Sequence, residues 1–323
     1  MTGKHSTQAR PGRAKTALAI SGAGVATAAI VVVILAALGL GSSPATPQAH
    51  GTTGPSISAG PPKTPYPATA NSRPATVSRH ADPLTTAAVS YLSSRAGTVM
   101  AAVYDIKTGQ TWTLGHGRPQ AEASIVKVDI LEALLAQHSA SRLSAGDRAL
   151  AAQMIEDSDN DAATSLWDSV GSASGIRTYN TAARLTHTTP SACVSCPGFP
   201  WPGWGLSTTL PTDQIILLQR LVEPNTLLTS AARRYALSLM ENVAPAQRWG
   251  VSGGVPAQAT VALKNGWLPL NDAGTDWQIN SVGWISGSGR DYLMAVLTTG
   301  NPDEQYGIDT ISQLATMVWA NLG

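Results

Sequence analysis

The spacing of apolar and polar residues divides the chain from about residue 84 onward into strands at both ends and helices between them. Near the start, "GTVMAAVYDIKTGQTWTLG" (97–115) predicts two strands joined by the turn "DIKTGQ". Near the end, three further strands are predicted at 259–267, 277–286 and 290–299. Because short turns join these consecutive strands, we expect antiparallel pairing.

Helical periodicity dominates the residues between these strands. Beyond a helix that begins near Ser124, helices are predicted at 143–155, 160–170, 174–185, 211–222, 229–243 and 310–322. Residues 186–210 lack this period and are predicted to form an irregular loop. The pattern indicates an α/β (α+β) fold, in which an antiparallel sheet is completed by both ends of the domain and a helical lobe is inserted.

The first 41 residues differ in pattern from the rest of the chain. Residues 1–15 carry basic but no acidic side chains, and residues 16–41 carry no charge. This run is long enough to cross a bilayer, with its basic flank as a cytoplasmic tail. We expect a single-pass transmembrane anchor in the cell membrane; the alternative is a signal segment whose cleavage releases a secreted protein. Both place the rest of the chain outside the cytoplasm.

Residues 42–83 contain nine prolines among Ser, Thr and Gly, which predicts an extended, disordered linker. Residues 84–323 then form the folded domain, which is long enough for one good hydrophobic core. The formal net charge is +1 and only 13% of residues are charged. This balance indicates no nucleic-acid partner, because such a partner requires a basic surface.

A lysine interrupts the apolar side of the helix predicted near residue 124. Within "EASIVKVDILEALLA" (122–136), helical spacing puts Lys127 inside the apolar stripe and puts Asp129 and Glu132 on the opposite side. Ser124 lies one turn earlier on the same face as Lys127. A lysine on a core-facing stripe must find a partner, reach water or lose its proton, because burial of an unpaired ammonium is costly.

Three short motifs follow one another along the domain: "SIVK" (124–127), "SDN" (158–160) and "KNG" (264–266). They stand at a helix start, between two helices and on a strand. In this order and context they resemble the S-x-x-K, S-D-N and K-[T/S]-G signature of penicillin-recognising serine hydrolases, which include class A β-lactamases and penicillin-binding proteins. The resemblance implies a β-lactamase-like serine hydrolase that forms an acyl-enzyme with β-lactams or with the D-alanyl stem peptides of peptidoglycan. It implies no metal and no organic cofactor.

By this resemblance, Ser124 is the nucleophile and Lys127 is the base that takes its proton. Serine is a poor nucleophile until a neighbour removes its proton, and a desolvated lysine near another cation is neutral enough to do so. This role gives Lys127 a reason to face inward. The resemblance further assigns Ser158 to relay a proton to the leaving nitrogen, and Asn160 to hold the lysine and the substrate amide.

The same resemblance assigns binding roles to the strand motif. Lys264 maintains a positive field and, with Asn265, attracts the substrate carboxylate. Gly266 lets the substrate backbone lie close along the strand. The backbone N–H groups of Ser124 and Trp267 are expected to form the oxyanion hole.

Three features depart from the family pattern. Asn265 stands where Thr or Ser is usual, and the serines of the first two motifs are 34 positions apart, which predicts a trimmed helical lobe. Class A β-lactamases also carry a glutamate after S-D-N that activates the deacylating water, whereas no glutamate lies between Glu156 and Glu223. The alternatives are therefore a non-catalytic sensor or binding module of the cell wall with this fold, or a D,D-carboxypeptidase that shares the acylation step.

The predicted irregular loop contains Cys193 and Cys196 in a C-x-x-C spacing. A redox motif requires a βαβ context, which is absent, and zinc requires four ligands, of which only His187 is near. Outside the cytoplasm we expect a disulfide that closes a tight surface loop. The neighbouring aromatic residues Phe199, Trp201 and Trp204 could line the rim of a site, but we expect them to pack this loop into the core.

Overall fold

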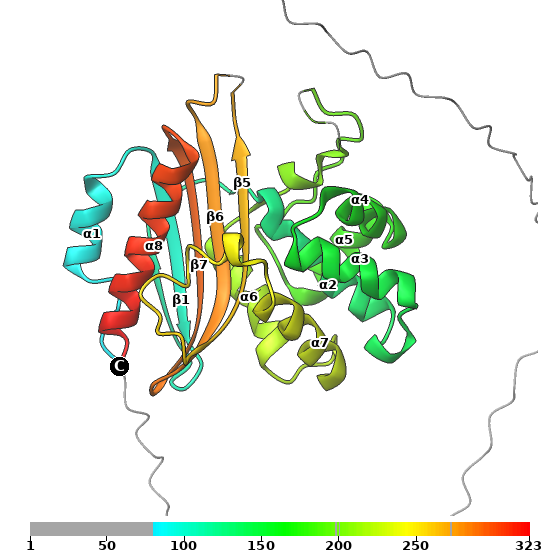
Figure 1. Ribbon diagram of the computed structural model, residues 1–323, viewed down its shortest axis with the longest axis horizontal. Helices are drawn as coiled ribbons and strands as arrows, with labels where there is room; N and C mark the ends of the chain where they lie inside the picture. The colour runs from blue at the N-terminus through cyan, green and yellow to red at the C-terminus, as the bar shows by residue number, and fades with distance from the viewer. Residues whose placement is uncertain (1–79, 198, 200, 272) are drawn as a thin grey trace, which may run out of the picture. The chain divides into compact units, whose positions relative to one another are not determined.

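The structure, a computed structural model, describes residues 80–197, 199, 201–271 and 273–323 (Figure 1). The predicted basic tail, apolar segment and most of the linker lie outside these residues. Among the residues that are described, no helix is both long and apolar enough to span a membrane.

Five antiparallel strands form the main sheet, in the order β2-β1-β7-β6-β5. They are β1 (Thr98–Asp105), β2 (Gln110–Leu114), β5 (Thr260–Pro269), β6 (Trp277–Gly287) and β7 (Arg290–Asn301). The first strand of the domain thus pairs with the last, and the antiparallel sheet completed by both ends of the domain is confirmed. A two-stranded sheet, β3 (Gln120–Ala121) with β4 (Thr208–Thr209), lies in the connections.

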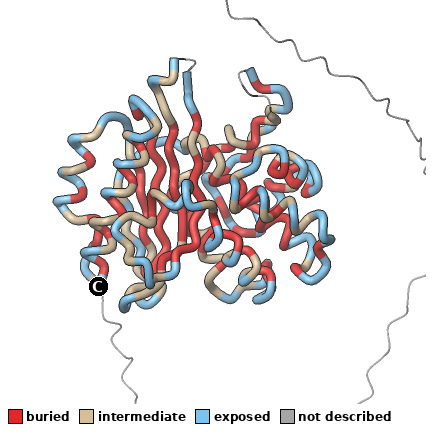
Figure 2. The backbone as a smooth tube through the Cα atoms, in the orientation of Figure 1, coloured by how far each residue is buried: buried red, intermediate tan, exposed pale blue. Residues whose placement is uncertain are grey.

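Helices cover both faces of the main sheet (Figure 1). On one face lie α1 (Thr86–Ser93) and α8 (Glu304–Asn321). On the other lie α6 (Pro211–Val222), α7 (Ser230–Glu241) and the lobe formed by α2 (Val126–Gln137), α3 (Ala145–Glu156), α4 (Asn160–Ser169) and α5 (Ser172–Ala183). The central strands β6 and β7 are consequently buried on both faces (Figure 2).

Two helices differ clearly from the sequence prediction, each for its own reason. Helix α8 begins at Glu304, earlier than the predicted start at residue 310, since the Asp303 carboxylate accepts a hydrogen bond from the Tyr306 N–H at 2.7 Å. Helix α1 was not predicted at all. It is short and buries only Ala88 and Leu92, so its apolar stripe is too sparse to read from the sequence.

Helix α2 is buried around most of its circumference, which the sequence analysis did not predict. Asp129 and Glu132, expected on a polar outer face, are 1% and 0% exposed. They face the packed side of the lobe, where the Tyr179 hydroxyl of α5 donates a hydrogen bond to the Glu132 carboxyl at 2.5 Å. Burial raises the pKa of both carboxyl groups, that of Glu132 well above its usual range. Helix α2 is therefore the central helix of the lobe, and its acidic residues are interior groups.

Replacement of Glu132 by glutamine tests this burial. Because the pKa is raised in the folded protein, folding retains a proton that the unfolded chain releases. The Glu132 contribution to the free energy of unfolding is therefore fully present below the ordinary pKa of 4.5 and is lost as the pH rises through the folded-state value. In urea unfolding followed from roughly pH 5 to pH 8, wild type should lose more stability than the neutral Glu132→Gln variant. Glu241→Gln, at an exposed position, is the matched control and should follow wild type. Parallel curves for wild type and Glu132→Gln would contradict the assignment.

Candidate functional site

Ser124 lies in a short 3₁₀ turn, Ala123–Ile125, that leads directly into α2. The preceding Ala123 has a left-handed φ of 49°, a strained conformation that the surrounding structure must hold. Asn280 of β6 supplies part of that support. Its side-chain amide is fully buried and donates to the carbonyls of Ala121 at 2.8 Å and Glu122 at 2.9 Å. Asn280 was not predicted as a site residue, because it stands in its strand beside two other polar residues, Gln278 and Ser281.

Gly266 of β5 lies directly against the same turn. A Cβ atom at this position would be 2.6 Å from the Ser124 nitrogen and 2.9 Å from the Glu122 carbonyl oxygen. No real side chain tolerates such contacts with backbone atoms. The glycine of "KNG" is thus required for the strand and the serine turn to approach each other.

Lys127 is fully buried one turn after Ser124. Its Nζ donates to the Ser158 carbonyl at 2.6 Å, to the Ser158 Oγ at 3.1 Å and to the Asn160 Oδ1 at 2.7 Å. The Trp204 ring covers the same amine, with its centroid 5.0 Å from Nζ. Burial lowers the pKa of Lys127 to about 7, while the nearby Asp159 carboxylate acts in the opposite direction. A pKa in this range lets the amine accept a proton at neutral pH.

Ser158 connects the two buried lysines of the site. It occupies the turn between α3 and α4 with a left-handed φ of 57°. Its Oγ receives hydrogen bonds from Lys127 and, at 2.9 Å, from Lys264 of β5. Burial and the charge of Lys127 lower the pKa of Lys264 well below its usual range. The hydroxyl therefore lies on a direct path for a proton between two amines.

The turn that carries Ser158 is held by its own motif. The Asp159 carboxylate caps α4 by accepting a hydrogen bond from the Ala162 N–H at 2.7 Å. With the helix start fixed in this way, Asn160 presents its side-chain oxygen to Lys127. The "SIVK", "SDN" and "KNG" motifs are thus brought together around the lysine amines.

One predicted binding residue is oriented differently from the expectation. The Asn265 amide donates to the carbonyls of Gln247 at 2.7 Å and Trp249 at 3.1 Å, and the side chain is only 1% exposed. Both of its N–H groups are therefore occupied in tying β5 to the preceding loop. The role of Asn265 in holding a substrate carboxylate stays a prediction, and it requires one of these two hydrogen bonds to be exchanged for the substrate.

Lys264 likewise has no direct access to a ligand. It is fully buried, and its amine donates to Ser158 and to the Asn265 carbonyl at 3.0 Å. Asn265 therefore contacts Lys264 through its backbone carbonyl rather than through its side chain. Any effect of Lys264 on a substrate passes through Ser158 or through its electrostatic field.

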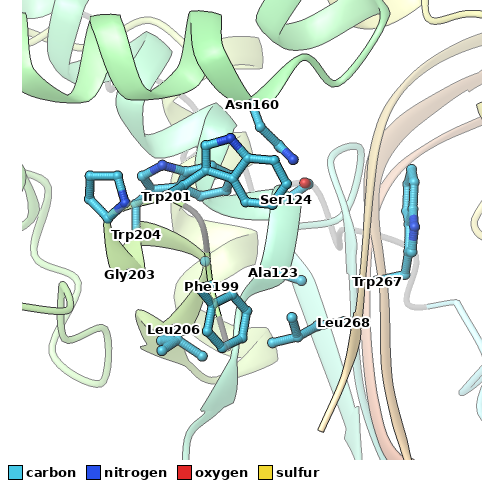
Figure 3. A pocket seen from close by; sticks show the side chains of 12 residues that line it. Ala123, Ser124, Asn160, Phe199, Trp201, Gly203, Trp204, Leu206, Trp267 and Leu268 are labelled. Atoms are coloured by element: carbon cyan, nitrogen blue, oxygen red, sulfur yellow. The ribbon is translucent and has the colours of Figure 1, made fainter. Parts of the chain in front are cut away.

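A cavity opens beside Ser124 (Figure 3). Trp201 and Trp204 lie on one side of the serine and Trp267 on the other. The Trp204 indole N–H donates to the Thr164 hydroxyl at 3.2 Å, which anchors this ring over Lys127. Trp204 combines the two possibilities for the aromatic residues of the irregular loop, because it is buried and also lines the cavity.

The loop that carries these tryptophans is closed by a disulfide between Cys193 and Cys196. Gly203 lies so close to it that a Cβ atom would be 2.4 Å from the Cys196 sulfur. Among the described residues, no group of three or more His, Cys, Asp or Glu side chains is arranged to hold a metal ion.

Comparison with known proteins gives a family and a fold. The family model described as "Beta-lactamase enzyme family" matches residues 144–322, a range that contains "SDN" and "KNG" but begins after Ser124 and Lys127. Among solved structures, the TLA-1 extended-spectrum beta-lactamase is similar with a TM-score of 0.66 and 17% identity, over 74% of this chain and 97% of that one. No curated protein sequence matches the chain significantly.

Two further solved structures have the same fold. A beta-lactamase from Xanthomonas campestris pv. campestris matches with a TM-score of 0.61 and 18% identity, over 73% of this chain and 96% of that one. An ancestral class A beta-lactamase matches with a TM-score of 0.60 and 18% identity, over 73% of this chain and 99% of that one. At such identities the likeness establishes the fold.

Gly266→Ala tests the close approach of β5 to the serine turn. The added methyl group must displace backbone atoms of residues 122–125, so the variant should be less stable than wild type by about 1–3 kcal/mol. Urea unfolding measures the difference. Gly146→Ala, on helix α3 where a Cβ meets only ordinary contacts, is the matched control and should be neutral or stabilising. Equal stability of Gly266→Ala and wild type would show that the turn is not packed against the strand as described.

Proposed function

The chain belongs to the beta-lactamase enzyme family, and we propose that it is a serine hydrolase in which Ser124 forms an acyl-enzyme with the carbonyl of a β-lactam or a D-alanyl peptide. One observation carries the proposal. Lys127, one turn after Ser124, is fully buried with its amine bonded to Ser158 and Asn160, and its pKa is lowered to about 7. A lysine so placed is a base rather than a solvated cation.

We propose an acylation step that uses Lys127 as the base and its neighbour Ser158 as the proton relay. The Ser124 Oγ attacks the carbonyl carbon, and its proton passes to the neutral Lys127 amine. The tetrahedral oxyanion is stabilised by the backbone N–H groups of Ser124 and Trp267. The proton then moves from Lys127 to the Ser158 Oγ, which gives its own proton to the leaving nitrogen as the C–N bond breaks. Lys264, bonded to the same hydroxyl at 2.9 Å, orients Ser158 for this transfer.

Deacylation is proposed to be slow. Hydrolysis of the ester requires a base that activates water, and no Asp or Glu side chain is among the described residues that line the cavity beside Ser124. Trp204 covers Lys127 from the cavity side, which also limits the access of water to that amine. These observations support a long-lived acyl-enzyme, as a penicillin-binding protein forms. They also favour the second candidate function, a cell-wall sensor or binding module, while a D,D-carboxypeptidase would require efficient release of the ester with its peptide substrate.

The location of the domain is a separate proposal. We propose that residues 16–41 anchor the chain in the cell membrane, that 42–83 act as a linker and that the hydrolase domain faces the exterior. This arrangement places the site where cell-wall peptides and β-lactams occur, and the Cys193–Cys196 disulfide is compatible with an oxidising compartment.

Membrane extraction tests the anchor. Because a long apolar segment resists removal from the bilayer, the full-length chain should stay in the pellet when membranes from expressing cells are washed with alkaline carbonate. A variant that lacks residues 1–41 should be found in the supernatant. Release of the full-length chain, or a mature N-terminus beyond residue 41, would favour the secreted alternative.

Intact-mass spectrometry with benzylpenicillin tests the acylation proposal. Wild type should gain the mass of the antibiotic and keep it, because acylation proceeds and water activation is poor. The Ser124→Ala variant should show no adduct while retaining the wild-type fold by circular dichroism. Labelling of Ser124→Ala at the wild-type rate would refute the assignment of the nucleophile, and rapid clearing of the wild-type adduct would refute slow deacylation.

The same assay identifies the base. The rate of adduct formation should rise with pH through the Lys127 pKa of about 7, because only the neutral amine takes the serine proton. Lys127→Ala should acylate more slowly by about 100-fold or more. A wild-type rate in Lys127→Ala at neutral pH would mean that another group accepts the proton.

A further inference from the structure

Two adjoining hollows extend away from Ser124. The cavity beside the serine, about 70 Å³ in volume, adjoins a groove of about 620 Å³. They share the lining residues Asn160, Phe199, Trp201, Trp267 and Leu268. The groove continues past these to residues of the β5–β6 hairpin, including Leu270 and Trp277. A group attached to a carbonyl at Ser124 therefore has a continuous surface along which to lie.

The lining of these hollows is aromatic and aliphatic. Among the described lining residues, none carries a charged side chain. The side chains with polar groups beyond the indoles are Ser124, Asn160 and Asn271. Lys127 and Lys264, the cations nearest to the serine, are fully buried and donate to Ser158. The surface thus offers apolar contact and aromatic stacking rather than ion pairing.

The aromatic walls are held in place without a ligand. The Trp201 indole N–H donates to the Asp161 carboxylate at 3.2 Å, and the Trp201 ring lies 6.5 Å from that of Trp204. On the opposite wall, Trp267 packs against Trp249 with centroids 6.1 Å apart. Because the rings are already ordered, a ligand that contacts them causes little loss of side-chain entropy. The burial of its apolar surface therefore contributes fully to the binding free energy.

We propose that this site selects substrates whose acyl group carries a bulky, uncharged aromatic side chain, which packs between Trp201 and Trp267. The selection acts on the acylation step, and it rests on the proposed function of Ser124. The side chain of the acyl group lies in the cavity and the groove while the carbonyl carbon stands at the serine. An acyl group that carries a negative charge meets no cation in the groove and approaches Asp161, so it is disfavoured.

Three penicillins that share one ring system and one ring carboxylate test the proposal. Benzylpenicillin carries a phenylacetyl group, 6-acetamidopenicillanic acid lacks only the phenyl ring, and α-carboxybenzylpenicillin adds a carboxylate beside it. Rates of Ser124 acylation are measured with the full-length protein by intact mass. Benzylpenicillin should react faster than the acetamido compound by at least about tenfold, because burial of its phenyl ring in an apolar pocket stabilises the transition state of acylation. The α-carboxy compound should be slower than benzylpenicillin.

Variants of the wall separate selectivity from damage to the fold. Trp201→Ala should bring the benzyl-to-acetamido rate ratio close to one, and Trp201→Phe should keep most of the ratio. Asp161→Ala removes the hydrogen-bond partner of the Trp201 indole without changing the lining, and it should lower the rate ratio. Asp161→Asn still accepts this hydrogen bond and should leave the rate ratio unchanged. Trp112→Ala, on strand β2 outside the groove, is the matched control and should leave the ratio unchanged.

The outcomes distinguish the two levels of the proposal. Equal rates for benzylpenicillin and the acetamido compound in wild type, or an unchanged ratio in Trp201→Ala, overturn the aromatic selectivity and leave acylation of Ser124 standing. Absence of any adduct with all three compounds in a folded wild-type protein overturns the proposed function, and the selectivity with it.

Discussion

The site depends on the burial of the Lys127 amine among oxygen acceptors. An ammonium removed from water is tolerated only where its hydrogen bonds are replaced, and here the Ser158 carbonyl, the Ser158 hydroxyl and the Asn160 oxygen replace them. That requirement fixes the α3–α4 turn against α2, with Ser158 in a left-handed conformation. The same burial lowers the lysine pKa toward neutrality. The same buried contacts thus hold the α3–α4 turn against α2 and set the pKa of the lysine on which the proposed function depends.

Residues of the main sheet complete the site around Ser124. Lys264 reaches Ser158 from β5, and Asn280 on β6 fixes the backbone just before Ser124. The absence of a side chain at Gly266 lets the strand lie against the serine turn. Ser124 therefore lies where the lobe meets the sheet, and each side contributes one of the two lysines. An error in either packing interface would separate groups that must lie within hydrogen-bond distance.

The irregular loop sets the chemical character of this site. Trp201 and Trp204, anchored by Asp161 and Thr164 on α4, cover the serine side of the cavity and leave Lys127 beneath an aromatic ring. Indole rings exclude water from this place, whereas a charged residue would hold it. Under the proposed function, slow deacylation and selection of apolar acyl groups would both follow from this one surface.

The five strands of the main sheet, the helices α2 to α7 and the inward position of Lys127 were predictable from the chain itself, because hydrophobic periodicity acts over a few residues. The direction of Asn265 was not, because it depends on which carbonyls the loop at 247–249 presents to β5. Nor was the burial of Glu132, because helical spacing shows an acidic face but not that α5 packs upon it with Tyr179. The cavity combines residues from the serine turn, α4, the irregular loop and β5. Only the tertiary structure brings such distant segments together, since their contacts depend on packing between elements rather than on local sequence.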